Sequence, residues 1–227
     1  MEFKHFWPTL IATLVLCVPG SIATAGDWPQ FLGPNRNGSA SADESLFDAW
    51  PESGPKIAWQ REVGSGFAGL AVADGVAILF HRIRGEEIVE ALNATTGKPI
   101  WKKSHATTYS TAYTPDNGPR CIPIIHKNRV YVFGAQGVLR CLDLSNGRII
   151  WTRMTHKDFG ALEGYFGASS TPIIDGDKIL VNVGAGRAGA GIVAFSLDKG
   201  KVQWKATNEL ASYSSPVAAT IDGSRHV

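Results

Sequence analysis

An eleven-residue phrase that occurs three times in this chain of 227 residues constrains the fold more than any other feature of the sequence. Each copy has a small residue, a strand ending in Asn, Asp or Ser, a polar turn closed by Gly, and a short strand ending in Trp. The copies are residues 91–101, 141–151 and 194–204, so their tryptophans are 50 and 53 residues apart. Self-similarity at this period predicts a propeller or a solenoid.

An apolar strand pair joined by a tight turn precedes each copy of the phrase. The pairs cover residues 70–80, 122–133 and 172–183, and Asp-Gly lies within the first and the third. Asp-Gly between apolar runs is a strong hairpin signal. Pro123, Pro172 and Pro216 open three such pairs, which suits a first strand residue because proline cannot donate to a ladder. Each unit thus supplies about four strands.

These units divide the chain from residue 56 onward. We expect blades at about residues 56–106, 107–156 and 157–210, and the start of another at 211–227. The predicted fold class is all-β, an open propeller arc of about three complete four-stranded blades plus the start of a fourth. Bare strand faces and edges at the ends of an arc favour association, so we also expect this form to self-associate.

The repeated phrase also resembles the tryptophan-docking motif, Ala-x-Asp-x-x-Thr-Gly-x-x-x-Trp, of the PQQ-like β-propellers. This family includes the pyrroloquinoline-quinone dehydrogenases and the BamB-type outer-membrane assembly propeller, and the resemblance covers roughly residues 56–227. It implies that the repeated tryptophans dock between adjacent blades and that the repeated glycines shape the turns. These residues are Trp101, Trp151 and Trp204, with Gly97, Gly147 and Gly200. Their implied roles are structural.

Residues 55–59, which end in Trp59, resemble the isolated last strand that completes the final blade in this family. The chain stops in what is expected to be the second strand of its fourth unit. We therefore expect a C-terminally truncated member of the family.

The N-terminus has the features of an export signal. Residues 1–5 are weakly basic, residues 6–18 are apolar, and Ala23-Thr-Ala25 offers small residues for a signal peptidase, so we predict a signal peptide over residues 1–25. A membrane anchor is the alternative, but the apolar stretch is shorter than the roughly 20 residues that span a bilayer. Leu14 to Cys17 approximates a lipobox, which leaves lipidation at Cys17 open. We expect a periplasmic, envelope-associated or secreted protein with no transmembrane segment in its mature form.

Residues 26–55 are expected to form an N-terminal strap and connector. The first part is rich in Gly, Pro and aromatic residues, and its Trp28 and Phe31 are expected to pack on the ring. Cys121 and Cys141 are the cysteines after the signal peptide. The blade pattern places a strand between them, which separates them beyond disulfide reach, so we predict two buried thiols.

Composition and short motifs give little support to other functions. Net charge is +2 and no basic stripe appears, so we expect no nucleic-acid partner. Residues 184–189 match a dinucleotide fingerprint, but a strand rather than a helix is expected to follow, which favours a hairpin loop. The histidines lack metal-ligand spacing, and no Gly-x-Ser-x-Gly elbow is present. We therefore predict no metal site and no catalytic residue.

Two long connections, residues 107–120 and 155–167, are the best candidates for a ligand surface. Connections above about 12 residues are uncommon unless they are functional or disordered, although variable loop decoration is the alternative. The candidate surface residues of these two connections and of the glycine-rich loop are Tyr109, Tyr113, Asp116, Asp158, Glu163, Tyr165 and Arg187.

Two functions compete. We expect an exported, non-enzymatic propeller that acts as a scaffold for other proteins and needs no cofactor. The alternative implied by the resemblance is a PQQ-dependent quinoprotein dehydrogenase with calcium, whose cofactor ligands would lie in the missing blades. Such enzymes commonly carry a vicinal Cys-Cys pair, and none occurs in this sequence. A polysaccharide-binding or lyase-associated propeller is a third possibility.

Overall fold

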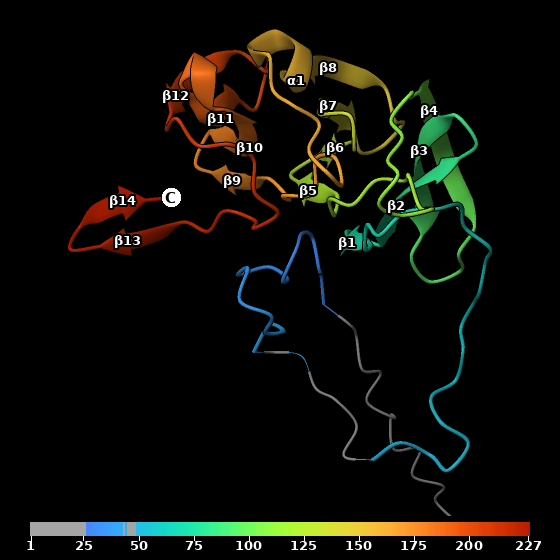
Figure 1. Cartoon of the computed structure of the whole chain (residues 1–227). Coiled ribbons are helices and arrows are strands. Elements are labelled where there is room, and N and C mark those ends of the chain that lie inside the picture. Colours follow the sequence, from blue (N-terminus) through green and yellow to red (C-terminus); the bar gives the residue numbers. More distant parts are fainter. Residues whose placement is uncertain (1–25, 43, 45–48) are drawn as a thin grey trace, which may run out of the picture.

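The computed structural model describes residues 26–42, 44 and 49–227. The predicted signal peptide and Cys17 lie outside the described residues. Three four-stranded antiparallel sheets follow one another along the chain, and a two-stranded hairpin comes last (Figure 1). The first blade contains β1 (Ala71–Ala73), β2 (Val76–Ile83), β3 (Glu86–Asn93) and β4 (Pro99–Ala106). The second contains β5 (Ile124–His126), β6 (Arg129–Phe133), β7 (Val138–Asp143) and β8 (Ile149–Met154).

The third blade contains β9 (Ile173–Asp175), β10 (Lys178–Ala185), β11 (Ala190–Ser196) and β12 (Val202–Ala206), and the final hairpin contains β13 (Ala219–Ile221) and β14 (Ser224–His226). In every blade the strands pair in chain order. The blades fan out around a common centre, with β1, β5 and β9 innermost and β4, β8 and β12 at the rim (Figure 1). This open arc of propeller blades confirms the predicted fold class.

The repeated phrase forms the outer strand pair of each blade, and its register explains the small first residue. Ala91 lies opposite Trp101, Cys141 opposite Trp151, and Ala194 opposite Trp204. A shift in strand register follows each of these pairs. A small side chain leaves room for the indole on the neighbouring strand, and the bulge turns the strand just before the glycine turn.

The hydrophobic core lies between blades rather than inside one sheet. One cluster joins the first and second blades and includes Phe80, Val89 and Val132. Another joins the second and third blades around Phe133 and Phe195. Each buried face therefore depends on the next blade, as is typical of repeat proteins. Cys121 and Cys141 are free and buried, which confirms the prediction of two unpaired thiols.

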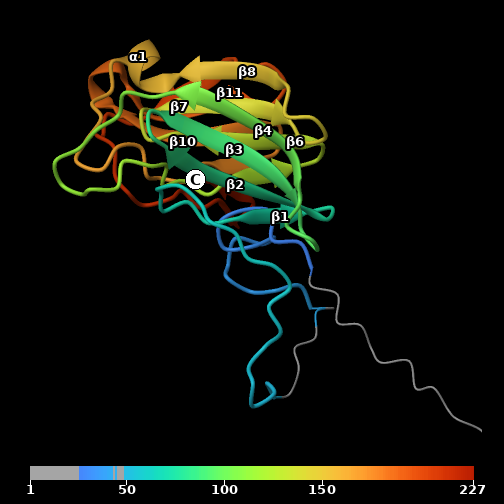
Figure 2. The same cartoon turned by 90° about the vertical axis from the view of Figure 1, so that its right-hand side faces the viewer.

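A strap at the N-terminus, residues 26–38, lies at the centre of the arc beside the innermost strands (Figures 1 and 2). Trp28 exchanges both backbone hydrogen bonds with Val72 on β1, and the Pro29 carbonyl accepts the N–H of Ile125 on β5. The Arg36 guanidinium donates to the carbonyls of Thr171, Pro172 and Pro216. The strap thus contacts all four units of the arc.

Two connections contain short helices that the sequence analysis assigned to loops. Helix α1 (Thr155–Phe159) follows β8 and ends at Gly160, whose backbone is left-handed. The 3-10 helix η1 (Gly186–Ala188) joins β10 to β11. Such short helices have no apolar period that a sequence can display. Among the described residues, none of the helices has the length and apolarity needed to cross a bilayer.

Candidate functional site

Two of the three tryptophans of the repeated phrase, Trp101 and Trp151, contact the next blade in the same way. Trp101 donates its indole N–H to the Leu144 carbonyl at 2.7 Å, and its ring lies against Gly147. Trp151 makes the same pair of contacts with Leu197 and Gly200. Gly97, Gly147 and Gly200 all have positive φ, and a Cβ on any of them would collide with an indole ring. Glycine is required there both by the backbone conformation and by the close approach of the ring.

Trp59 makes the equivalent contacts with the first blade, although it lies outside the three copies of the phrase. Its indole donates to the Ala94 carbonyl at 2.8 Å, and its ring lies against Gly97. Residues 55–64 pair with no strand in the described structure. Trp204, on β12, is 37% exposed. Docking of Trp204 against a following blade stays a prediction.

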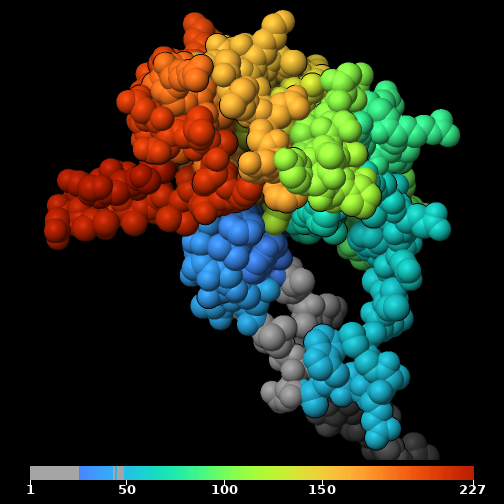
Figure 3. All heavy atoms as spheres, viewed as in Figure 1, coloured from blue at the N-terminus to red at the C-terminus, as the bar shows by residue number. Residues whose placement is uncertain are grey.

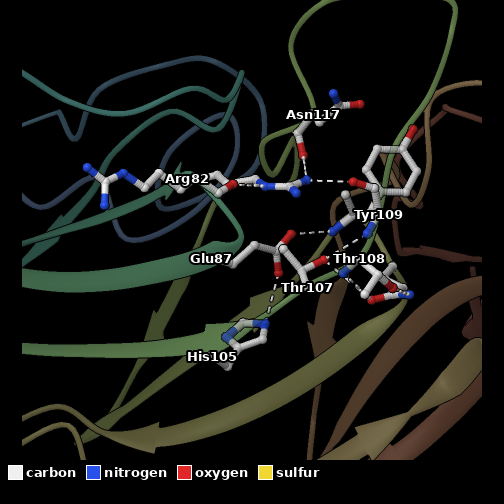
Figure 4. Close-up of polar contacts among 10 residues, drawn as sticks. Arg82, Glu87, His105, Thr107, Thr108, Tyr109 and Asn117 are labelled. Carbon is white, nitrogen blue, oxygen red and sulfur yellow. Dashed lines mark hydrogen bonds and ion pairs between the residues drawn. The ribbon is translucent and has the colours of Figure 1, made fainter.

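The connection of residues 107–120 is fixed by an arginine from the first blade. The Arg82 guanidinium donates to the carbonyls of Tyr109 and Asn117, which lie near the two ends of the connection (Figure 4). The Asp116 carboxylate accepts the backbone N–H groups of Gly66 and Gly118. These contacts hold a long irregular segment in one conformation.

A buried carboxylate ties the first blade to the second beneath this connection. Glu87 is 1% exposed, and it accepts the Ala135 N–H at 2.9 Å (Figure 4). Its other carboxylate oxygen lies 2.9 Å from Nε2 of His105. Nearby, Gln136 of the second blade donates to Thr108 (Figure 4). A buried charge is tolerated because it has these polar partners, and we assign Glu87 a structural role.

The two long connections meet on one face of the arc, and there they expose a group of rings. Figure 3 shows residues 107–120 (light green) and 160–170 (light orange) side by side on the face toward the viewer. Thr111 donates its hydroxyl to the Tyr165 carbonyl at 2.6 Å, and the rings of Tyr113 and Tyr165 are edge to face at 4.8 Å. We name the exposed rings on this face the aromatic patch, which consists of Phe67, Tyr113, Tyr165, Phe166 and Tyr213.

The aromatic patch is held together by contacts between separate units. Phe166 lies 6.1 Å from Tyr113 and 5.5 Å from Tyr213, measured between ring centroids. The Phe166 backbone N–H donates to the Tyr213 hydroxyl. Members of the patch are between 38% and 64% exposed. A group of exposed rings held in fixed positions is typical of a surface that contacts a partner.

A pocket of about 340 Å³ opens within this patch. It is lined by Phe67, Phe166, Tyr213, Thr114, Ser169 and Arg120. The Arg120 guanidinium lies over the Phe67 ring at 5.6 Å and over the Tyr109 ring at 5.5 Å. Its N–H groups donate to the carbonyls of Asp116 and Gly118. Arg120 is therefore a cation in a fixed position among aromatic walls.

The structure brings together only part of the predicted surface set. Tyr113 and Tyr165 belong to the aromatic patch. Tyr109 lies beneath Arg120 and is 1% exposed, and burial raises the pKa of its hydroxyl. The Asp116 carboxylate accepts the backbone N–H groups of Gly66 and Gly118. The remaining three lie outside the patch: Asp158 pairs with Arg153 on β8, Glu163 lines a separate small cavity beside His156, and Arg187 is exposed on η1.

The glycines of residues 184–189 have a packing explanation. A Cβ on Gly184 would collide with Ala211, and one on Gly186 would collide with Asn208. The connection after β12 therefore lies directly on this hairpin, and close approach accounts for Gly184 and Gly186, while Gly189 has a positive φ. The strand predicted to follow them is β11.

Sequence reasoning missed Phe67, Arg120 and Tyr213 as site residues, and Arg82 as a positioning residue. A signal for two of them exists within the repeats. Phe67, Arg120 and Ser169 each stand four residues before the first residue of an innermost strand, β1, β5 or β9. Equivalent positions of successive blades converge near the centre of a propeller, so aligning the repeats on these strands would have grouped the three pocket residues.

Fold and site together define a β-propeller arc with an aromatic surface over its centre. A family model described as outer membrane protein assembly factor BamB matches residues 43–225. The chain belongs to this family. The outer membrane protein assembly factor BamB of Moranella endobia (strain PCIT) is 27% identical over 135 residues, which cover 60% of this chain and 29% of that protein. The chain thus spans less than a third of the length of this curated relative.

The chain is also similar to solved structures. A quinohemoprotein alcohol dehydrogenase from Comamonas testosteroni is 21% identical with a TM-score of 0.51, over 81% of this chain and 28% of that one. BamB from Moraxella catarrhalis is 21% identical with a TM-score of 0.45, over 75% of this chain and 44% of that one. The likeness to the dehydrogenase concerns the fold alone.

Proposed function

We propose that this chain is part of an exported, non-enzymatic propeller that binds other proteins through the aromatic patch. The observation that carries the proposal is the convergence of exposed rings from separate units on one face, fixed by Arg82, Asp116 and Tyr213. Aromatic side chains give large contact areas at low entropic cost, and they are enriched in the centres of protein interfaces. The family match to an outer membrane protein assembly factor supports a role as a binding scaffold.

An envelope location fits the same proposal. The matched relative is named as an outer membrane assembly factor, and the N-terminal sequence has the features of an export signal. Fractionation of cells that produce the full chain with a C-terminal tag would test the location. Recovery in the cytosol with an intact N-terminus would contradict it.

A quinone-dependent dehydrogenase is the second candidate, and only the shared fold favours it. Calcium in such a site needs several oxygen ligands. Within residues 26–42, 44 and 49–227, no three His, Cys, Asp or Glu side chains gather closely enough to hold a metal ion. We derive no catalytic step for the described residues.

Site-specific photo-crosslinking in the envelope would test the scaffold proposal. A benzophenone amino acid is placed at Tyr113 or Tyr165 of the full chain, with Ile100, an exposed position on β4, as the control. We expect the same envelope protein to be captured from both patch positions and not from Ile100. Phe166→Ala should weaken the capture, because that ring joins Tyr113 to Tyr213. Equal capture at all three positions would contradict a specific surface.

A further inference from the structure

The pocket within the aromatic patch combines three apolar walls with one charge. Phe67, Phe166 and Tyr213 supply the walls, and Arg120 is the charged side chain among the lining residues. Thr114 and Ser169 add hydroxyl groups. Apolar walls with a few polar groups that fix orientation are typical of a binding pocket.

Arg120 carries a charge that the described residues leave without an opposite partner. None of the ion pairs in the described part of the chain includes it. Its guanidinium is held by the Asp116 and Gly118 carbonyls and lies between the Phe67 and Tyr109 rings. The side chain is half-buried, so less entropy is lost when it binds an anion than for a freely moving arginine.

A carboxylate is the anion that best fits this arrangement. Guanidinium groups pair with carboxylates through parallel hydrogen bonds, and aromatic surroundings strengthen that pairing by excluding water. The walls require an apolar group beside the anion. Further exposed rings, Tyr113 and Tyr165, extend the contact surface beyond the pocket, which suits a chain segment that passes over the patch.

We propose that Arg120 and the surrounding rings form a binding site for a partner segment that carries an Asp or Glu side chain next to an apolar side chain. The proposal rests on the proposed function, since it names what the aromatic patch recognises. Phe67 and Phe166 receive the apolar side chain, and Arg120 receives the carboxylate. The residues come from separate units, so binding requires the assembled arc.

Peptide titrations of the full chain test this selectivity. The probes are acetyl-Gly-Phe-Glu-Gly-amide, its Gln counterpart, and acetyl-Gly-Phe with a free terminal carboxylate, each followed by saturation-transfer NMR. We expect the Glu peptide to bind about tenfold more tightly than the Gln peptide. Arg120→Gln should remove this preference, and Arg120→Lys should keep part of it. Arg187→Gln, at an exposed arginine on η1, should leave the preference unchanged.

Phe67→Ala removes one apolar wall, while the hydrogen bonds that hold Arg120 to the Asp116 and Gly118 carbonyls remain. This substitution should lower the affinities of the Glu and the Gln peptide by a similar factor. Equal affinity of both peptides for the unmodified chain, or a preference that survives Arg120→Gln, would overturn the proposal. Tighter binding of the free terminal carboxylate than of the Glu peptide would overturn the assignment to a side chain. Either result would leave the crosslinking at Tyr113 and Tyr165 as a separate test of the scaffold function.

Discussion

Trp101 donates its indole N–H to the Leu144 carbonyl of the next blade, while Trp151 shares its acceptor, the Leu197 carbonyl, with Arg129 and Tyr131. Removing one indole donor therefore leaves Leu144 without a side-chain donor but leaves Leu197 with two. We expect Trp101→Phe to lower the free energy of unfolding by about 2 kcal/mol and Trp151→Phe by less. Denaturant titration of both variants measures the difference. Equal losses would show that ring packing, not the hydrogen bond, determines the effect.

Gly147 should be far less tolerant of substitution than Gly176, although both have positive φ. A Cβ on Gly147 would lie 2.5 Å from the Trp101 ring, whereas one on Gly176 would meet nothing within 4 Å. Gly176→Ala bears only backbone strain of about 1 kcal/mol, and Gly147→Ala should cost about 3 kcal/mol because the indole must move. The two melting temperatures provide the comparison. A Gly147 variant as stable as the Gly176 variant would contradict the contact.

Arg36 should stabilise the contact between the strap and the third and fourth units. Its guanidinium donates to three backbone carbonyls, so Arg36→Met should lower stability by about 2 kcal/mol. We also expect faster hydrogen exchange around Thr171 and Pro216. Arg187→Met is the control, because this exposed arginine makes no side-chain hydrogen bond within the described part of the chain. Unchanged exchange in the Arg36 variant would mean that the strap does not fix these segments.

Stability should fall in mildly acidic solution. Burial lowers the pKa of His81, His126 and His156 below the value of about 6.5 usual for histidine. The unfolded chain then binds more protons than the folded one as the pH falls below 6.5, so stability is present above this pH and is lost below it. Protonation of His81 would also break its hydrogen bond from the Gly64 N–H.

Denaturation at pH 7.5 and 5.5 measures this loss, and His156→Gln should make it smaller. The same substitution at the neighbouring Lys157, which is exposed, is the control. A pH dependence that is unchanged in His156→Gln would exclude that residue as a contributor.

Arg82→Lys should loosen the connection of residues 107–120 while leaving the blades folded. The Arg82 guanidinium donates from Nη1 to the Tyr109 and Asn117 carbonyls and from Nε to the Arg84 carbonyl, and a lysine ammonium cannot occupy both donor positions. We expect faster proteolysis in this connection with little change in melting temperature. Arg84→Lys, at an exposed residue that follows β2, is the control. Equal proteolysis of both variants would contradict the role given to Arg82.

Much of the fold was predictable because each blade repeats one local pattern. Asp74-Gly75 marked the first inner hairpin, and the phrase ending in Trp101 marked the outer strand pair, so the blades followed from turns and periodicity. Helix α1 was missed because it makes barely one turn. The span containing Trp59 has no strand partner in the described structure, and its sequence alone could not show which blade it would contact.

The candidate site was harder to predict because it is assembled across units. Tyr113 and Tyr165 were found because they lie in long connections. Tyr213 lies in a shorter connection, and Phe67 precedes the first strand, so loop length gave no signal for either. Tyr109 was placed on the surface, yet it is buried, because loop length says nothing about which side of a loop faces inward.

The strap links the order of synthesis to the order of folding. Arg36 lies 180 residues before its partner Pro216, and 136 residues before Pro172. During translation the strap is therefore made long before the carbonyls that accept its hydrogen bonds. The two strands of each inner hairpin, by contrast, are consecutive in the sequence and can pair as soon as both are made. Contacts of such high sequence separation form late and slow the overall rate. We therefore infer that the contacts between the strap and the third and fourth units form last, after the blades that supply the acceptor carbonyls have been synthesised.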